Sequence, residues 1–117
     1  MRWDFWERAK LFLRPGTRVL FMGAEGRDPR FPLTPEDGPF DVVLIYHVPY
    51  DLAELHGLLK PGGFFLTEQL GGTPPDYNLE NQAPLAKRAG FRVVYADQSY
   101  EGGQHRFIIT AGRRKNP

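Results

Sequence analysis

Apolar residues follow a helical period at the start of the chain. Five of them recur at the spacing that gathers side chains on one helical face: Phe5, Trp6, Ala9, Phe12 and Leu13. Acidic residues precede basic ones along this segment, an order that suits the helix dipole. Pro15 and Gly16 follow directly and are poor helix continuers. The segment is therefore predicted to form one amphipathic helix that ends before Pro15.

Short apolar runs bounded by turn residues predict five strands. The runs cover 18–22, 40–46, 64–67, 92–99 and 104–110. The first two are almost continuously apolar, which is typical of parallel strands covered on both faces. The last two are joined by the glycine-containing turn 100–103 and are predicted to form a hairpin.

Two further helices are predicted between these strands. Asp51 with Glu54 three residues later resembles a capping box, and the segment 60–63 (KPGG) ends the helix that it starts. A second helix is predicted over 81–89, with Gly90 as its left-handed stop and Pro84 tolerable only in its first turn. The segments 27–39 and 71–78 are predicted loops. The resulting order, α-β-loop-β-α-β-α-β-β, predicts a largely parallel α/β sheet with one antiparallel strand near its end.

Composition limits the alternatives. With 117 residues, 41% of them hydrophobic and 25% charged, the chain is expected to form a single domain spanning 1–117. The absence of cysteine excludes disulfides, thiolate metal sites and a cysteine nucleophile. We find neither a signal-peptide pattern nor an apolar run of about 20 residues, so we expect a cytoplasmic protein without membrane association. Frequent arginine and proline hint at a thermophilic source.

The charged residues do not predict a nucleic-acid partner. The formal net charge is only +1, and the one basic cluster, 113–115 (RRK), has the character of a solvated chain end. His47, Asp51 and His56 do not have the support of a second cluster that a metal site would need. Ser99 lacks a nucleophile elbow, and no phosphate-binding loop is present. We therefore expect no metal ion and no hydrolytic triad.

Four blocks of the sequence resemble class I S-adenosylmethionine-dependent methyltransferases. The block 19–26 (VLFMGAEG) resembles their first motif, and 40–50 (FDVVLIYHVPY) resembles their fourth strand. The block 58–68 (LLKPGGFFLTE) resembles the turn into their fifth strand, and 85–94 (LAKRAGFRVV) is similar to their following helix and sixth strand. The resemblance covers nearly the whole chain. It implies a truncated three-layer Rossmann-like methyltransferase fold with a mostly parallel five-stranded sheet and one antiparallel strand.

The resemblance also implies a cofactor and site residues. Family members bind S-adenosylmethionine where the first and fourth strands meet. The matching residues here are Gly23, Ala24 and Gly26 in the first turn, with Tyr46 and His47 after the fourth strand. His47 is a candidate base for the methyl acceptor, because imidazole titrates near neutral pH. The alternative is that His47 only caps a strand and bonds to the backbone.

The interval between the first motif and the fourth strand is short. Family members have two strands and two helices there, and these help to hold the adenosine part of the cofactor, whereas this chain has only 27–39. Glu36 or Asp37 is a candidate substitute for the missing ribose ligand, although loop carboxylates are commonly just solvated. Phe21 and Glu25 depart from the first motif.

Two functions therefore stay open. The first is a compact methyltransferase, a transferase that binds a small-molecule ligand, S-adenosylmethionine, and whose methyl acceptor is unknown. The second is a non-catalytic dimerisation or binding module that has lost the adenosine half of the site. Loss of the intervening strands would also leave 19–22 at a sheet edge, to be covered by 27–39 or by a second copy in a homodimer.

Overall fold

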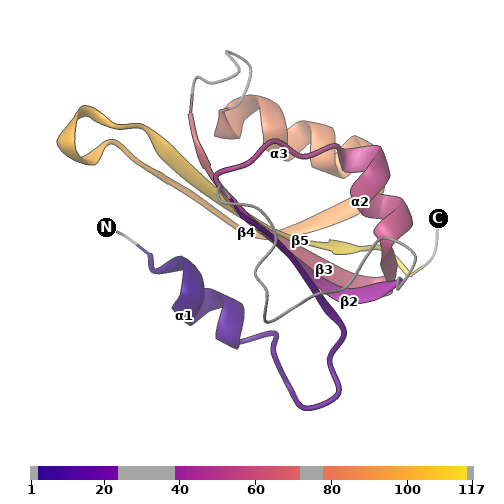
Figure 1. Cartoon of the computed structure of the whole chain (residues 1–117). Helices are drawn as coiled ribbons and strands as arrows, with labels where there is room; N and C mark the ends of the chain where they lie inside the picture. Colours follow the sequence, from indigo (N-terminus) through magenta and orange to yellow (C-terminus); the bar gives the residue numbers. More distant parts are fainter. Residues whose placement is uncertain (1–2, 24–38, 72–77, 116–117) are drawn as a thin grey trace.

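Helices lie on both faces of a single five-stranded sheet in the computed structural model, which describes residues 3–23, 39–71 and 78–115 (Figure 1). The strands lie in the order β1-β2-β3-β5-β4. Their bounds are Val19–Gly23 (β1), Phe40–Tyr46 (β2), Leu59–Leu70 (β3), Phe91–Ser99 (β4) and Arg106–Arg113 (β5). None of the helices within the described ranges has the length and apolar content needed to cross a bilayer.

Strand direction confirms part of the prediction and corrects the rest. β1, β2 and β3 pair in parallel, and β5 pairs antiparallel with both β3 and β4. The five strands and the single reversed strand are thus as expected. Counted by pairings, however, the sheet is mixed, and "mostly parallel" was not quite right. The cause is β5, which the hairpin inserts between β3 and β4, so that one strand reverses two pairings.

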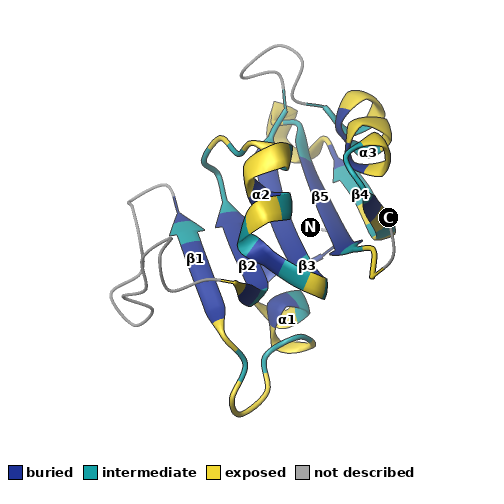
Figure 2. Cartoon of the chain, turned by 90° about the vertical axis from the view of Figure 1, so that its right-hand side faces the viewer, coloured by how far each residue is buried: buried dark blue, intermediate teal, exposed yellow. Residues whose placement is uncertain are grey.

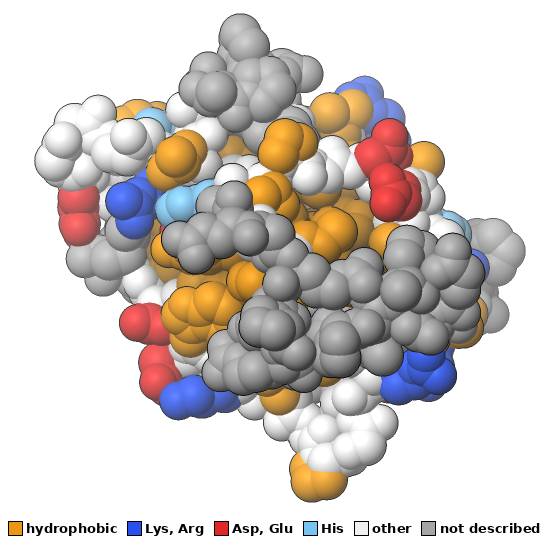
Figure 3. All heavy atoms as spheres, in the orientation of Figure 1, with side chains coloured by type: hydrophobic (Ala, Val, Ile, Leu, Met, Phe, Trp, Pro, Cys, Tyr) orange, Lys and Arg blue, Asp and Glu red, His pale blue; other side chains and the backbone are white. Residues whose placement is uncertain are grey.

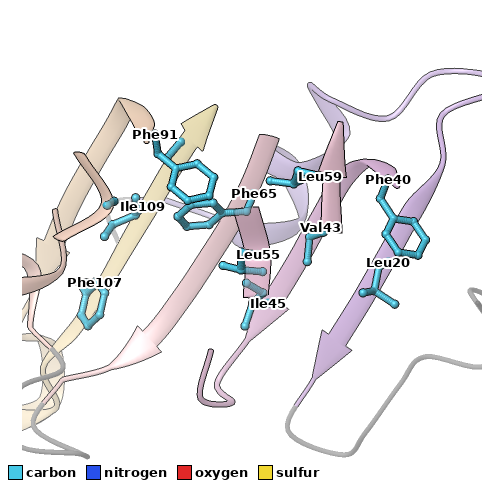
Figure 4. Close-up of a cluster of buried hydrophobic side chains, with 12 residues drawn as sticks. Leu20, Phe40, Val43, Ile45, Leu55, Leu59, Phe65, Phe91, Phe107 and Ile109 are labelled. Carbon is cyan, nitrogen blue, oxygen red and sulfur yellow. The ribbon is translucent and has the colours of Figure 1, made fainter. Parts of the chain in front are cut away.

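The helices form the outer layers. α1 (Phe5–Lys10) covers one face, and α2 (Leu52–Leu58) and α3 (Leu79–Arg88) cover the other (Figure 2). The larger core cluster lies beneath α2 and α3 and contains Leu55, Phe65, Phe91 and Ile109, all at most 1% exposed (Figure 4). A second cluster lies beneath α1. The predicted three layers are therefore present.

α1 is shorter than the hydrophobic period predicted. Asp4 caps it by accepting a hydrogen bond from the Glu7 amide, and the helix ends at Lys10, so Phe12 lies beyond it. Phe5 is buried as expected, whereas Trp6 is 41% exposed. The early end frees Phe12 to contact the ring of Phe64 on β3. Packing against the sheet thus outweighed the local period.

Helix caps were predicted better than helix lengths. Asp51 accepts a hydrogen bond from the Glu54 amide at the start of α2, and Gly90 has the expected left-handed φ of +97° after α3. Asn78 caps α3, which begins at Leu79, two residues before the predicted start. Pro84 therefore lies in the second turn and not in the first, where its missing N–H removes one helical hydrogen bond.

The first residues of β3 were predicted as a helix stop and not as a strand. β3 begins at Leu59, directly after α2, and runs through Lys60–Gly63 with an irregular register opposite β2. Gly63 is needed there, because an added Cβ would lie 2.9 Å from the carbonyl oxygen of Asp41. The β4–β5 hairpin is confirmed, with a short 3₁₀ turn at Glu101–Gly103.

β1 forms one edge of the sheet, as the resemblance implied. Within the described residues it pairs only with β2. Figure 3, which shares the viewpoint of Figure 1, shows hydrophobic side chains at several places on this face of the molecule. The prediction that 27–39 is a loop falls almost entirely on residues 24–38, and the predicted loop 71–78 on 72–77. Both lie outside the described residues.

Candidate functional site

The carboxyl ends of β1, β2 and β3 bring three residues into one row. Gly23 on β1 is in register with Tyr46 on β2, and Tyr46 is in register with Glu68 on β3. Open α/β sheets bind ligands outside the carboxyl ends of their strands. The row therefore marks the edge of the sheet where a ligand site is expected.

His47 follows this row directly and has an unusual backbone. Its φ of 57° is the only positive φ of a non-glycine residue in the described part of the chain, a conformation that is uncommon for side chains with a Cβ. Its amide donates a hydrogen bond of 2.9 Å to the Glu68 carbonyl oxygen. The imidazole stacks on the Tyr46 ring, with centroids 3.9 Å apart and planes within 9°. The turn thus directs the imidazole back across the ends of the strands.

Glu68 is a buried carboxylate with two side-chain partners. It is 3% exposed. Its Oε1 accepts a hydrogen bond of 2.7 Å from Trp3 Nε1, and its Oε2 lies 2.5 Å from His47 Nε2. Burial by itself would raise the pKa of Glu68, but the hydrogen bonds from His47 and Trp3 outweigh burial and lower this pKa below its ordinary value. Glu68 is therefore ionised at neutral pH.

This contact decides which imidazole nitrogen is available. When His47 is neutral and Glu68 is ionised, Nε2 carries the proton, and Nδ1 is left with a lone pair. No described residue forms a hydrogen bond with Nδ1. The side chain is 15% exposed, so it is partly accessible. Nδ1 is therefore the ring nitrogen left unbonded among the described residues, and Glu68 holds the ring in one orientation.

The alternative, that His47 only caps a strand, describes its backbone amide and not its side chain. The His47 amide does bond to the backbone of β3, as a strand cap would. Its side chain, in contrast, bonds to a carboxylate and not to the main chain. The imidazole thus has a polar partner, Glu68, which a strand cap would not need.

The next residue on β3 holds the same loop from the opposite face. Gln69, also buried, donates from Nε2 to the Val48 carbonyl at 2.7 Å and to Thr67 Oγ1 at 2.8 Å. Tyr50 donates to Gln82 Oε1 at 2.7 Å, which joins the loop to α3. Successive strand residues point to opposite faces of the sheet. Glu68 therefore bonds to His47 on one face, and Gln69 bonds to Val48 on the other.

Aromatic side chains from α1 cover Tyr46. The Phe5 and Trp6 rings lie 5.0 and 6.0 Å from it, and Trp6 also contacts Phe21 at 5.3 Å. Burial, followed by the charge of Glu68, raises the pKa of the Tyr46 hydroxyl. Phe21, at the position where the resembled family commonly has an acidic residue, is 8% exposed and serves as a core residue.

Only part of the predicted site can be placed. The structure brings Gly23, Tyr46 and His47 together. The other predicted cofactor residues, Ala24, Gly26, Glu36 and Asp37, lie outside the described residues. His56, on α2, packs edge-on against the Phe91 ring of β4.

Sequence reasoning missed Glu68, Gln69 and Trp3. Two adjacent polar residues at the end of an apolar strand were the available signal for Glu68 and Gln69. Trp3 gave none, because it lies 65 positions from its partner Glu68.

Solved structures share the fold of this chain. No protein-family model and no curated protein matches the chain. An S-adenosylmethionine-dependent methyltransferase from Mesorhizobium loti is 11% identical, with a TM-score of 0.53. The match covers 63% of this chain and 62% of that one. The 1,6-didemethyltoxoflavin-N1-methyltransferase of Burkholderia thailandensis, solved with bound 1,6-didemethyltoxoflavin and S-adenosylhomocysteine, is 23% identical with a TM-score of 0.51. The match covers 65% of this chain and 44% of that one.

The cyclase SpnF also has this fold, with 12% identity and a TM-score of 0.52 over 64% of this chain and 50% of its own. The chain thus spans about half the length of the structures it matches. At these identities the likeness establishes architecture. The protein has the fold of class I S-adenosylmethionine-dependent methyltransferases.

Proposed function

We propose that the chain is a methyltransferase-like protein that binds S-adenosylmethionine at the carboxyl ends of β1 and β2, with His47 as the base for the acceptor. One observation carries this proposal: the register that aligns Gly23, Tyr46 and Glu68 and sets His47 beside them. This is the edge where the fold binds ligands.

The residues present suit a cationic cofactor. A sulfonium is attracted to negative charge, and the ionised Glu68, although buried and bonded to Trp3 and His47, places such a charge close to this edge. Gly23 has no side chain to obstruct close approach of a ligand to the end of β1. When bound, S-adenosylmethionine would supply an electrophilic methyl group.

The chain's own residues would position the acceptor and take its proton. Glu68 keeps the proton of His47 on Nε2, and Trp3 holds the second oxygen of Glu68, so the ring has little freedom to rotate. Nδ1 would accept the proton of an O–H or N–H group on the methyl acceptor. The lone pair on that oxygen or nitrogen would then attack the methyl group. Such proton transfer typically contributes about 10²- to 10⁴-fold.

Calorimetric titration separates binding from catalysis. Folded protein titrated with S-adenosylmethionine and with S-adenosylhomocysteine should release heat with a stoichiometry of one. His47→Ala tests both roles given to the imidazole: cofactor binding should weaken, and methyl transfer should fall further than binding does. Absence of heat at millimolar ligand, with the protein shown to be folded, would overturn the proposal.

A second candidate is a non-catalytic module that dimerises through β1. Two observations favour it: Phe21 is a core residue and provides no carboxylate, and β1 has one paired neighbour among the described residues. The likeness to a cyclase also agrees with the rule that one fold hosts different chemistries. A monomer by light scattering at micromolar concentration would argue against this candidate.

A further inference from the structure

A second region of interest lies at the opposite end of the sheet. Two adjoining grooves, of about 480 and 570 Å³, are found near the amino ends of β1–β4 and the carboxyl end of β5. They share Gly62, Phe64 and Lys115. Because they share these three residues, the two depressions are considered together and are called here the amino-edge groove. Its lining residues are separate from His47 and Glu68.

Glycines form the floor of the amino-edge groove. Phe64, Gly112 and Arg92 are in register across β3, β5 and β4, so their positions share one face of the sheet. A Cβ on Gly112 would lie 2.9 Å from Cε1 of Phe64, and one on Gly62 would lie 3.0 Å from Cε of Lys115. The two glycines therefore let the Phe64 ring and the Lys115 side chain lie close to the backbone.

The lining of the amino-edge groove is strongly cationic. Arg92, Arg113, Arg114 and Lys115 line the first depression, and the second adds Arg14 and Lys60. Asp41 is the one acidic residue among those that line it, and it already pairs with Lys60 at 3.3 Å.

Most of these cations are available to a ligand. Arg113 is held by the carbonyl oxygens of His56 and Leu59, at 3.0 and 2.6 Å. Arg14, Arg92 and Arg114 are exposed and have no ion pair with any described residue. The net charge of the whole chain is only +1, so the positive charge here is a local accumulation.

An aromatic wall stands beside these cations. The Phe64 and Phe12 rings are half-buried, with centroids 5.1 Å apart. Grooves that combine positive charge with aromatic faces are typical of proteins that bind single-stranded nucleic acid. We propose that the amino-edge groove binds a single-stranded nucleic acid, with its phosphates on Arg92, Arg114 and Lys115 and a base against Phe64. The presence of several cations around one aromatic ring favours a strand with several phosphates over a single small anion.

This proposal reverses an expectation from the sequence. There, Arg113–Lys115 had the character of a solvated chain end. The fold adds three cations from distant segments, namely Arg14, Lys60 and Arg92, and places an aromatic ring between them. The proposal does not depend on methyl transfer, because it concerns the other end of the sheet.

Fluorescence anisotropy with a labelled oligouridylate of about 12 nucleotides tests the proposal. If three phosphates are contacted, binding should weaken about 20-fold between about 50 and 200 mM salt. Arg92→Glu should weaken binding about tenfold and reduce the salt dependence. The matched control is Arg88→Glu, the same charge change at an exposed position on α3, which should have little effect.

The aromatic contact is tested separately. Phe64→Leu keeps an apolar side chain and should weaken binding at least fivefold, whereas Phe64→Tyr keeps the ring and should bind as the parent does. Circular dichroism establishes that each variant is folded. Equal weakening by Arg88→Glu and Arg92→Glu, or unchanged binding by Phe64→Leu, would overturn the proposal. So would competition by tripolyphosphate as strong as that by unlabelled oligouridylate at equal phosphate concentration.

Discussion

The two ends of the sheet use charge in opposite ways. At the carboxyl ends, one carboxylate is buried, and both of its oxygens are held by side chains, His47 and Trp3. At the amino ends, exposed cations gather around Phe64 with few partners among the described residues. A buried charge needs exact hydrogen bonding to be tolerated, whereas an exposed patch needs only an accumulation of like charges. We therefore expect the carboxyl end to govern stability and the amino end to affect association alone.

The largest effect is expected from Glu68→Ala. This change leaves the Trp3 N–H and the His47 ring without their acceptor in a buried place, so the free energy of unfolding should fall by about 3 kcal/mol. Urea unfolding measures it. Glu68→Gln is the matched control: it keeps an acceptor for Trp3 and should lose clearly less. Equal losses would mean that the shape of the side chain matters and its charge does not.

Acid should remove the same stabilisation gradually. The pKa of Glu68 in the folded chain lies below its ordinary value of 4.5, because the bonds from His47 and Trp3 outweigh burial. Its contribution is therefore fully present above pH 4.5 and is lost as the pH falls through the lowered pKa of the folded state. Unfolding curves between neutral pH and pH 3 should show a smaller acid loss in Glu68→Gln than in the parent. An equal acid loss in Glu68→Gln and in the parent would mean that ionised Glu68 is not the source of this stabilisation.

A smaller effect is expected from Trp3→Phe. The ring stays apolar while the N–H donor is lost, so stability should fall by about 1 kcal/mol, with some of the loss due to the smaller ring. Trp6→Phe is the control, since Trp6 is 41% exposed and Trp3, not Trp6, donates the indole hydrogen bond to Glu68. A loss in Trp6→Phe that matches the one in Trp3→Phe would show that ring packing dominates.

The smallest effect on stability is expected at the amino-edge groove. Arg92→Glu alters an exposed side chain without an ion pair to any described residue, so the free energy of unfolding should change by less than about 0.5 kcal/mol. Thermal unfolding at low salt measures it. A loss of more than about 2 kcal/mol would mean that Arg92 supports the fold, and the contrast between the two ends would fail.

Local signals in the sequence predicted the elements well. Asp51 and Gly90 were identified as helix boundaries because a cap depends on residues only a few positions apart. The hairpin of β4 and β5 followed from two apolar runs and a short turn. Where a neighbouring element competes, the same signals failed: α1 ends early beside the sheet, and Pro84 lies a turn deeper in α3 than predicted.

The candidate sites were predicted less completely. His47 lies directly after a strand, as predicted, but its partner Glu68 was not predicted. The basic residues 113–115 were noticed, yet their association with Arg14 and Arg92 was not. Both omissions have one cause, because neither pairing leaves a pattern at short sequence separation.

By itself the amino-acid sequence determined the order of helices and strands and the turns between them, because hydrophobic periods and caps act over a few residues. Only the tertiary structure decided that Trp3 meets Glu68 across 65 positions and that cations from four segments share one groove. Strand register sets these encounters, and register depends on the packing of the whole sheet.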